Sequence, residues 1–140
     1  MKFTLNKTLV RELSFGASHS IHSPAADEAG GQLFQKFEVS VRYAEDNLRG
    51  FAIVFAMTLN LAELEESMKI EFWAFFEADQ EIDDAFKQGH FPKVNAPAIA
   101  YPYLRSFVTT FMVSAGYSPI YLPTVNFSAM ESDRRSRSAE

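Results

Sequence analysis

Few side chains in this sequence could do chemistry, and their spacing does not favour catalysis. The histidines are His19, His22 and His90, and there is no cysteine, which excludes disulfides and thiolate metal sites. His19 and His22 share a segment of small and polar residues, where only Asp27 and Glu28 could loosely complete a metal site. Solvent-exposed loop histidines are therefore the favoured interpretation.

The carboxylates also lack the spacing of a known site. Five of them lie close together in the chain: Glu77, Asp79, Glu81, Asp83 and Asp84. Their spacing is not that of a calcium loop, and acids at the start of a helix interact favourably with its dipole. There is also no phosphate-binding glycine loop, nucleophile elbow or zinc-binding helix motif. We therefore expect neither an enzyme nor a bound cofactor or metal.

The amino-acid composition narrows the classes of protein that remain possible. A net charge of −5 argues against a protein that binds nucleic acid through its phosphates. No apolar run is long enough to span a membrane, the N-terminus does not resemble a signal peptide, and the lack of cysteine fits the cytoplasm. A domain of 140 residues would struggle to bury 14 Phe, 5 Tyr and 1 Trp alone. The excess predicts oligomer contacts, a ligand groove, or both.

Four segments have the alternating pattern of strands: 2–15, 33–44, 50–62 and 67–78. In the first, the apolar face is predicted to hold Phe3, Leu5, Leu9, Leu13 and Phe15, with Val10 as an exception. The third has one large and one small apolar face, which predicts a central strand. In the fourth, Trp73 and Phe75 lie between charges on the face that should be wet.

The elements after the strands are helical. Residues 79–91 predict a short acidic helix ending near Gly89, and apolar residues at steps of three or four predict an amphipathic helix ending before Gly116. Four strands followed by two helices predict an α+β fold, in which a four-stranded antiparallel sheet carries both helices on one face. We expect a single domain over residues 1–130, a loop over residues 16–32, and a disordered charged tail over residues 131–140.

The segment after Gly116 is apolar, although Pro119 and Pro123 interrupt regular structure. Its large side chains are Tyr117, Ile120, Tyr121, Leu122, Val125 and Phe127. A loop of this composition is either covered or a binding surface.

Residues 95–127 resemble the signature region of the SecB chaperone family. The matching residues are Pro97, Ile99, Tyr101, Pro102, Tyr103 and Arg105, then Gly116, and then Pro119, Leu122, Pro123, Val125, Asn126 and Phe127. The run Ala74–Phe75–Phe76 stands loosely where the family has Gly–Ile–Phe. The predicted order of strands and helices agrees over nearly the whole chain.

The resemblance implies a homotetramer, a dimer of dimers, that holds unfolded polypeptides in apolar grooves without ATP. Adaptable aromatic and methionine side chains suit such clients. We expect the groove to include seven residues: Trp73, Phe75, Tyr101, Tyr121, Leu122, Val125 and Phe127.

Members that act in protein export dock the translocation ATPase through acids on the outer face of the sheet. Glu12 and Glu71 are the candidates here, but Gly16 stands where a second acid would be expected. Residues 16–32 look shorter than the usual connection, and the tail is not acidic. Three alternatives therefore stay open: a SecB-like chaperone of a toxin–antitoxin system that protects the antitoxin, an adaptor oligomer for one folded partner, and a small-molecule-binding α+β protein.

Overall fold

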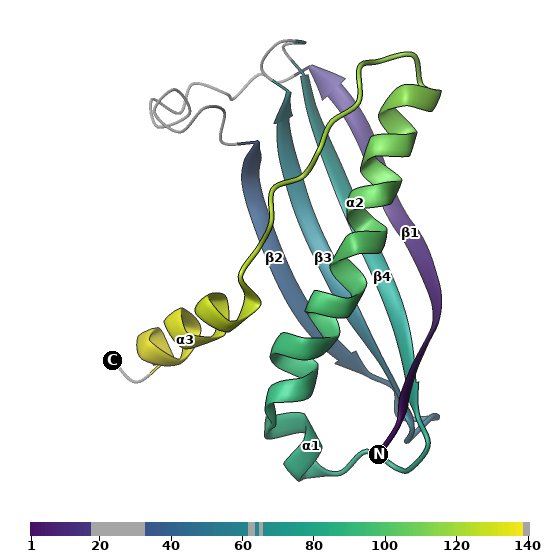
Figure 1. Ribbon diagram of the computed structural model, residues 1–140, viewed down its shortest axis with the longest axis vertical. Helices are drawn as coiled ribbons and strands as arrows, with labels where there is room; N and C mark the ends of the chain where they lie inside the picture. Colours follow the sequence, from purple (N-terminus) through teal and green to yellow (C-terminus); the bar gives the residue numbers. More distant parts are fainter. Residues whose placement is uncertain (18–32, 62–63, 65, 139–140) are drawn as a thin grey trace.

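A four-stranded antiparallel sheet is the framework of the protein, in a computed structural model that describes residues 1–17, 33–61, 64 and 66–138 (Figure 1). Its strands are β1 (Phe3–Ala17), β2 (Phe34–Tyr43), β3 (Gly50–Leu61) and β4 (Glu66–Ala78). They lie in the order β1-β4-β3-β2, so β3 is central as predicted. The four predicted strands are confirmed. His19, His22 and the predicted loop lie outside the described residues, except for Gly16 and Ala17, which end β1.

One face of the sheet carries the core. Large side chains pair across the two central strands, as in Phe51 opposite Phe76 and Phe55 opposite Phe72. All four are buried, because the long helix lies across this face (Figure 1). We call this the helix face and the opposite one the open face, since no described element covers it.

Two irregularities in β1 change the predicted distribution of its side chains. The register with β4 shifts between Leu5 and Lys7 and again between Val10 and Glu12. Each shift leaves one residue unpaired and reverses the alternation beyond it. Leu9 therefore lies opposite Trp73 on the open face, and Val10 lies opposite Phe72 on the helix face. The prediction that Leu9 shares the face of Phe3 is thus wrong.

The helices follow the sheet in the predicted order. The short helix α1 (Asp84–Gln88) begins where the Asp83 carboxylate accepts a 2.8 Å hydrogen bond from the Phe86 N–H. One wide turn, η3 (Phe91–Asn95), leads into α2 (Ala96–Ser114). Gly116, with φ of +96°, ends α2 in the left-handed region that favours glycine. The predicted α+β fold is confirmed. Within the described ranges, no helix is long and apolar enough to cross a lipid bilayer.

A third helix, α3 (Phe127–Ser138), occupies most of the predicted disordered tail. The Asn126 side chain caps its start by accepting a hydrogen bond from the Ala129 N–H at 3.0 Å. Glu131 is buried and pairs with Arg134 at 2.6 Å and with Arg135 at 3.1 Å, one turn further along. The expectation of disorder therefore does not hold for residues 131–138. Charge composition pointed to a solvated tail, whereas these pairs and the packing of Phe127 support a helix.

Candidate functional site

The loop over residues 117–126 is tied to one flank of α2. The Tyr101 hydroxyl donates a 2.5 Å hydrogen bond to the Pro123 carbonyl. The Thr109 Oγ1 lies 2.6 Å from the Ile120 carbonyl oxygen, and 3.1 Å from that of Arg105 in its own helix. These contacts satisfy carbonyls in a segment whose prolines prevent regular pairing. The loop therefore has a defined path along α2 without being helix or strand.

Side chains of this loop alternate between core and solvent. Leu122 is 1% exposed and joins the hydrophobic core, whereas its neighbour Tyr121 is 73% exposed. Val125 is half-buried. A phenol ring left this open on a tethered loop is available to a partner.

Two shallow hollows lie between this loop and α2, and we call them together the groove. The first has a volume of ≈ 350 Å³ and is lined by Pro102, Arg105, Ser106, Thr109, Thr110, Tyr121 and Leu122. The second has a volume of ≈ 400 Å³ and is lined by Val94, Ala98, Thr124, Val125, Asn126, Phe127 and Ser128. The helix residues recur every three or four positions, so they form one flank. At 1.5 Å per residue, the flank from Val94 to Thr110 is roughly 24 Å long, which matches about seven residues of extended chain.

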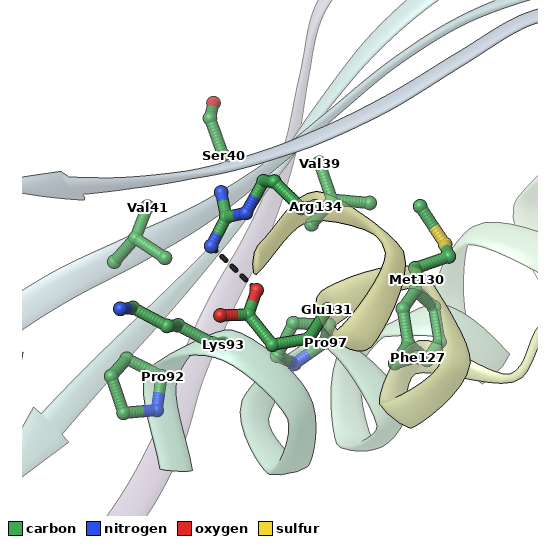
Figure 2. Close-up of a pocket in the computed structure, with 10 residues that line it drawn as sticks. All are labelled: Val39, Ser40, Val41, Pro92, Lys93, Pro97, Phe127, Met130, Glu131 and Arg134. Atoms are coloured by element: carbon green, nitrogen blue, oxygen red, sulfur yellow. Dashed lines mark hydrogen bonds and ion pairs between the residues drawn. The ribbon is translucent and has the colours of Figure 1, made fainter. Parts of the chain in front are cut away.

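A smaller pocket adjoins the groove and shares Phe127 with it. Figure 2 shows this pocket between β2, η3, the start of α2, and α3. Its volume is ≈ 70 Å³, and its apolar lining consists of Val39, Val41, Pro92, Pro97, Phe127 and Met130. The paired carboxylate of Glu131 and guanidinium of Arg134 also line it, together with Lys93 and Ser40. The pocket has the size of one apolar side chain.

The chemistry of the groove suits binding. The polar lining of the groove consists mostly of hydroxyl groups. Its one charged residue is Arg105, which is half-buried and has its Cζ 5.9 Å from the centre of the Tyr101 ring. Burial raises the pKa of Tyr101 to about 12, although the nearby Arg105 charge opposes this shift. This phenol is therefore a hydrogen-bond donor at neutral pH. Within residues 1–17, 33–61, 64 and 66–138, no group of His, Asp or Glu could hold a metal.

The structure separates the seven predicted client-binding residues. Tyr121 and Val125 line the groove with exposed surface. Leu122 and Phe127 form its buried floor, and Tyr101 lies in the core. Trp73 and Phe75 lie on the open face, because they alternate along β4 with Phe72 and Phe76, which belong to the core on the helix face. The seven therefore do not share one surface of the protomer.

The two candidate docking acids also lie on the open face. Glu12 forms an ion pair with Lys69 at 3.5 Å, and Glu71 accepts a hydrogen bond from the Trp73 indole N–H at 2.6 Å. Both carboxylates thus already have partners on their own sheet.

The prediction missed the helix side of the groove. Ala98, Pro102, Ser106 and Thr109 lie three or four residues apart, so a helical wheel would have placed them together. No signal in the sequence indicated that the later loop crosses this flank, because the two are brought together only by tertiary contacts.

The outward face of α2 has an unusual composition. Ile99, Tyr103 and Val113 are 46%, 53% and 54% exposed, and Ser106 and Thr110 lie between them. Arg105, on the groove flank, is the only charged residue of α2. A solvated helix face normally carries charge, so this composition is unusual for a face that no described element covers.

Comparison with known proteins places this geometry in a family. The family described as "Preprotein translocase subunit SecB" matches residues 1–138. The chain belongs to the SecB family. The resemblance of residues 95–127 to this family is therefore confirmed. SecB proteins are chaperones of protein export and not enzymes.

Individual relatives agree with this assignment. The "Protein-export protein SecB" of Xylella fastidiosa is 28% identical over 134 residues, which cover 91% of this chain and 73% of that protein. An uncharacterized protein of Methanocaldococcus jannaschii is 28% identical over 97 residues, or 66% of this chain, and the match spans only 61% of that relative's length.

Solved structures show the same SecB-like fold. The SecB-like chaperone of Mycobacterium tuberculosis, solved in complex with a ChAD peptide from an antitoxin, superposes with a TM-score of 0.60 at 13% identity. The superposition covers 89% of this chain and 88% of that one. A protein of unknown function from Streptococcus agalactiae superposes with a TM-score of 0.52 at 12% identity, over 89% and 98% of the two chains.

Proposed function

We propose that this protein is an ATP-independent holdase that binds unfolded polypeptides in the groove and serves protein export in the cytoplasm. The observation that carries the proposal is the groove itself, an apolar and hydroxyl-lined channel with Tyr121 exposed at its edge. Membership of the SecB family supports the link to export.

The shape and lining of the groove explain how it would hold many different clients. It is shallow and without carboxylates, so it neither selects one side chain tightly nor repels acidic segments. Serine and threonine hydroxyls can donate to or accept from the unpaired backbone of an extended client, and apolar lining can take its alternate side chains. The small pocket at Phe127 would take one apolar side chain at the end of the groove.

The outward face of α2 supports assembly into a homotetramer, in which a second copy covers Ile99, Tyr103 and Val113. Several grooves on one assembly raise the effective concentration of binding sites along a single client. Weak contacts in the individual grooves would then together retain an unfolded client without nucleotide.

A suppression assay tests the proposed holdase. A chemically unfolded protein is diluted without nucleotide into buffer containing the chaperone, and its aggregation is followed by light scattering. We expect suppression by the native protein and weaker suppression by Tyr121→Ala. Leu48→Ala is the matched control, because Leu48 is also an exposed large apolar residue but lies in the β2–β3 turn. Equal suppression by all three proteins would place client binding outside the groove, and no suppression by any would refute the holdase.

Export also predicts a partner at the membrane. Docking of the translocation ATPase through Glu12 and Glu71 stays a prediction, in which a partner would share these carboxylates with Lys69 and Trp73. Binding of a single antitoxin in place of many unfolded clients would favour the toxin–antitoxin alternative instead.

A further inference from the structure

The side chain of Arg105 lines the groove without an ionic partner. Its guanidinium forms no salt bridge and no hydrogen bond with any residue that the structure describes. The Tyr101 ring, with its centre 5.9 Å from the Arg105 Cζ, attracts this charge. A ring does not accept conventional hydrogen bonds from the five N–H donors of a guanidinium. Water therefore satisfies these donors only while the groove is empty.

A client that fills the first hollow removes this water. Arg105 is already half-buried, and burying a charge further without a partner is costly. No carboxylate lines either hollow, and the other polar side chains of the first hollow are the hydroxyls of Ser106, Thr109 and Thr110. The groove therefore supplies no charge that compensates Arg105. Compensation has to come from the client.

We propose that Arg105 selects client segments in which an Asp or Glu side chain pairs with its guanidinium, while an apolar side chain four positions away lies in the second hollow. The planar fork of arginine matches a carboxylate with two parallel hydrogen bonds. This selectivity rests on the proposed holdase function and adds a preference to it. Segments without an acid would still bind through apolar contacts, but with the charge of Arg105 unpaired.

The spacing of four positions follows from α2. Arg105 lies seven residues after Ala98 and eleven after Val94, the helix residues that line the second hollow. At 1.5 Å per residue, these separations are roughly 10 and 16 Å. Four residues of extended chain span about 13 Å and return the side chain to the same side. An acid and an apolar residue at this spacing can therefore both point towards α2.

The carboxylate is expected on an internal residue of the client. The first hollow continues past Arg105 in both directions, because Pro102 and Thr109 line it on either side along the helix. A chain that follows the groove passes Arg105 and does not end there. A side-chain carboxylate is therefore favoured over the C-terminal carboxylate of a polypeptide, which is the competing source in the test.

The experiment titrates dye-labelled peptides with the full-length protein and follows fluorescence anisotropy. The acidic peptides, blocked at both ends, are Gly-Leu-Ser-Ser-Ser-Glu-Gly and Gly-Glu-Ser-Ser-Ser-Leu-Gly, which cover both chain directions. Matched peptides carry Gln or Lys in place of Glu. Gly-Leu-Ser-Ser-Ser-Gly with a free C-terminus places a terminal carboxylate at the same spacing. We expect an acidic peptide to bind about tenfold more tightly than its Gln partner, and the Lys peptide to bind most weakly.

Variants at Arg105 distinguish selection by charge from a structural role. Arg105→Gln should bind the Glu and Gln peptides equally. Arg105→Lys should keep a reduced preference for Glu, of about threefold, because the charge stays and the fork is lost. Arg105→Glu should reverse the preference towards the Lys peptide, which loss of packing alone would not do. Arg42→Gln is the matched control, because Arg42 is exposed on β2 opposite Ala52 and outside the groove lining, so it should keep the native preference.

Four results would overturn the proposal: equal binding of the Glu and Gln peptides by the native protein, tighter binding of the free C-terminus, a Glu preference that survives in Arg105→Gln, or no binding of any peptide. Suppression of client aggregation is measured in parallel. Suppression by the native protein without a Glu preference would overturn the selectivity and leave the holdase. A Glu preference without suppression would refute the holdase and leave a peptide site that selects carboxylates.

Discussion

The Tyr101 hydroxyl donates a 2.5 Å hydrogen bond to the carbonyl of Pro123, which lies 22 residues later in the chain. This bond joins the core side of α2 to the loop that forms the other wall of the groove. Together with the contact between Thr109 and Ile120, this hydrogen bond fixes the position of the loop, whose prolines prevent regular structure. These two side chains therefore help the buried Leu122 to hold this wall of the groove in place.

Thr109→Val tests the contact at the far end of the loop. Valine keeps the shape of the side chain but cannot donate to the Ile120 carbonyl, which lies 2.6 Å from Thr109 Oγ1. We expect the free energy of unfolding to fall by about 1 kcal/mol, and the loop amides to exchange faster with solvent. Thr110→Val is the matched control, since Thr110 is exposed. Similar exchange in both variants would show that the contact does not position the loop.

Substitutions at two adjacent residues distinguish the buried floor of the groove from its exposed edge. Leu122→Ala removes a side chain that is 1% exposed, so it should lower the free energy of unfolding by about 2–5 kcal/mol. Tyr121→Ala removes one that is 73% exposed, so stability should change by less than about 0.5 kcal/mol while retention of an unfolded polypeptide weakens. Chemical denaturation and co-elution on a sizing column measure the two effects. Loss of retention without loss of stability in Leu122→Ala would contradict this assignment.

The stability of the protein should fall in strong alkali. Burial raises the pKa of Tyr101 from 10.0 to about 12, so the folded state holds this proton more tightly than the unfolded state does. The resulting stability is complete below pH 10 and is lost as the pH rises towards about 12, by an amount on the order of 2–3 kcal/mol. Burial also raises the pKa of Tyr43, which adds a loss in the same direction.

Tyr101→Phe isolates this contribution. Denaturant unfolding at several pH values between 9 and 12 should give a shallower loss for the variant than for the native chain. At neutral pH, the variant should be less stable by about 1 kcal/mol, because the bond to Pro123 is absent. Parallel pH curves for the two proteins would mean that Tyr101 ionises normally.

Charge on the outward face of α2 should prevent assembly. Tyr103→Glu and Val113→Glu each place a carboxylate on a face that lacks charge, and burying it against a second copy would be costly. We expect light scattering to show a smaller species than the native oligomer, with native circular dichroism. Leu48→Glu, in the β2–β3 turn, should leave the mass unchanged. An unaltered mass in all three variants would place the subunit contacts elsewhere.

The contribution of the buried Glu131 to the stability of α3 can be tested by Glu131→Ala. This change removes the acceptor that Arg134 and Arg135 share, and it uncovers part of the pocket beside Val39. We expect a loss of about 1 kcal/mol and faster hydrogen exchange at the end of α3. Asp133→Ala is the control, since Asp133 is exposed two residues away. Equal melting temperatures for both variants would mean that the ion pairs of Glu131 do not stabilise the protein.

Local patterns in the amino-acid sequence determine most of the fold. The alternation of apolar and polar residues identified β1 to β4, because the side-chain period of a strand can be recognised within a short segment. Gly116 marked the end of α2, because the backbone freedom of glycine is also a local property. The proline-broken apolar loop indicated a segment that is either covered or a binding surface, and the family resemblance added Tyr121 and Val125 as groove residues, which the structure places along two hollows. These features require no knowledge of distant contacts.

Tertiary structure alone decided which residues share a surface. The first irregularity of β1 turned Leu9 to the open face, since a shift of one residue reverses the alternation beyond it. Because α2 and the loop pack on the helix face, Trp73 and Phe75 on the opposite face lie away from the groove, whereas Tyr101, Leu122 and Phe127 belong to the core. Burial and proximity depend on contacts between segments far apart in the chain, which composition and periodicity do not record.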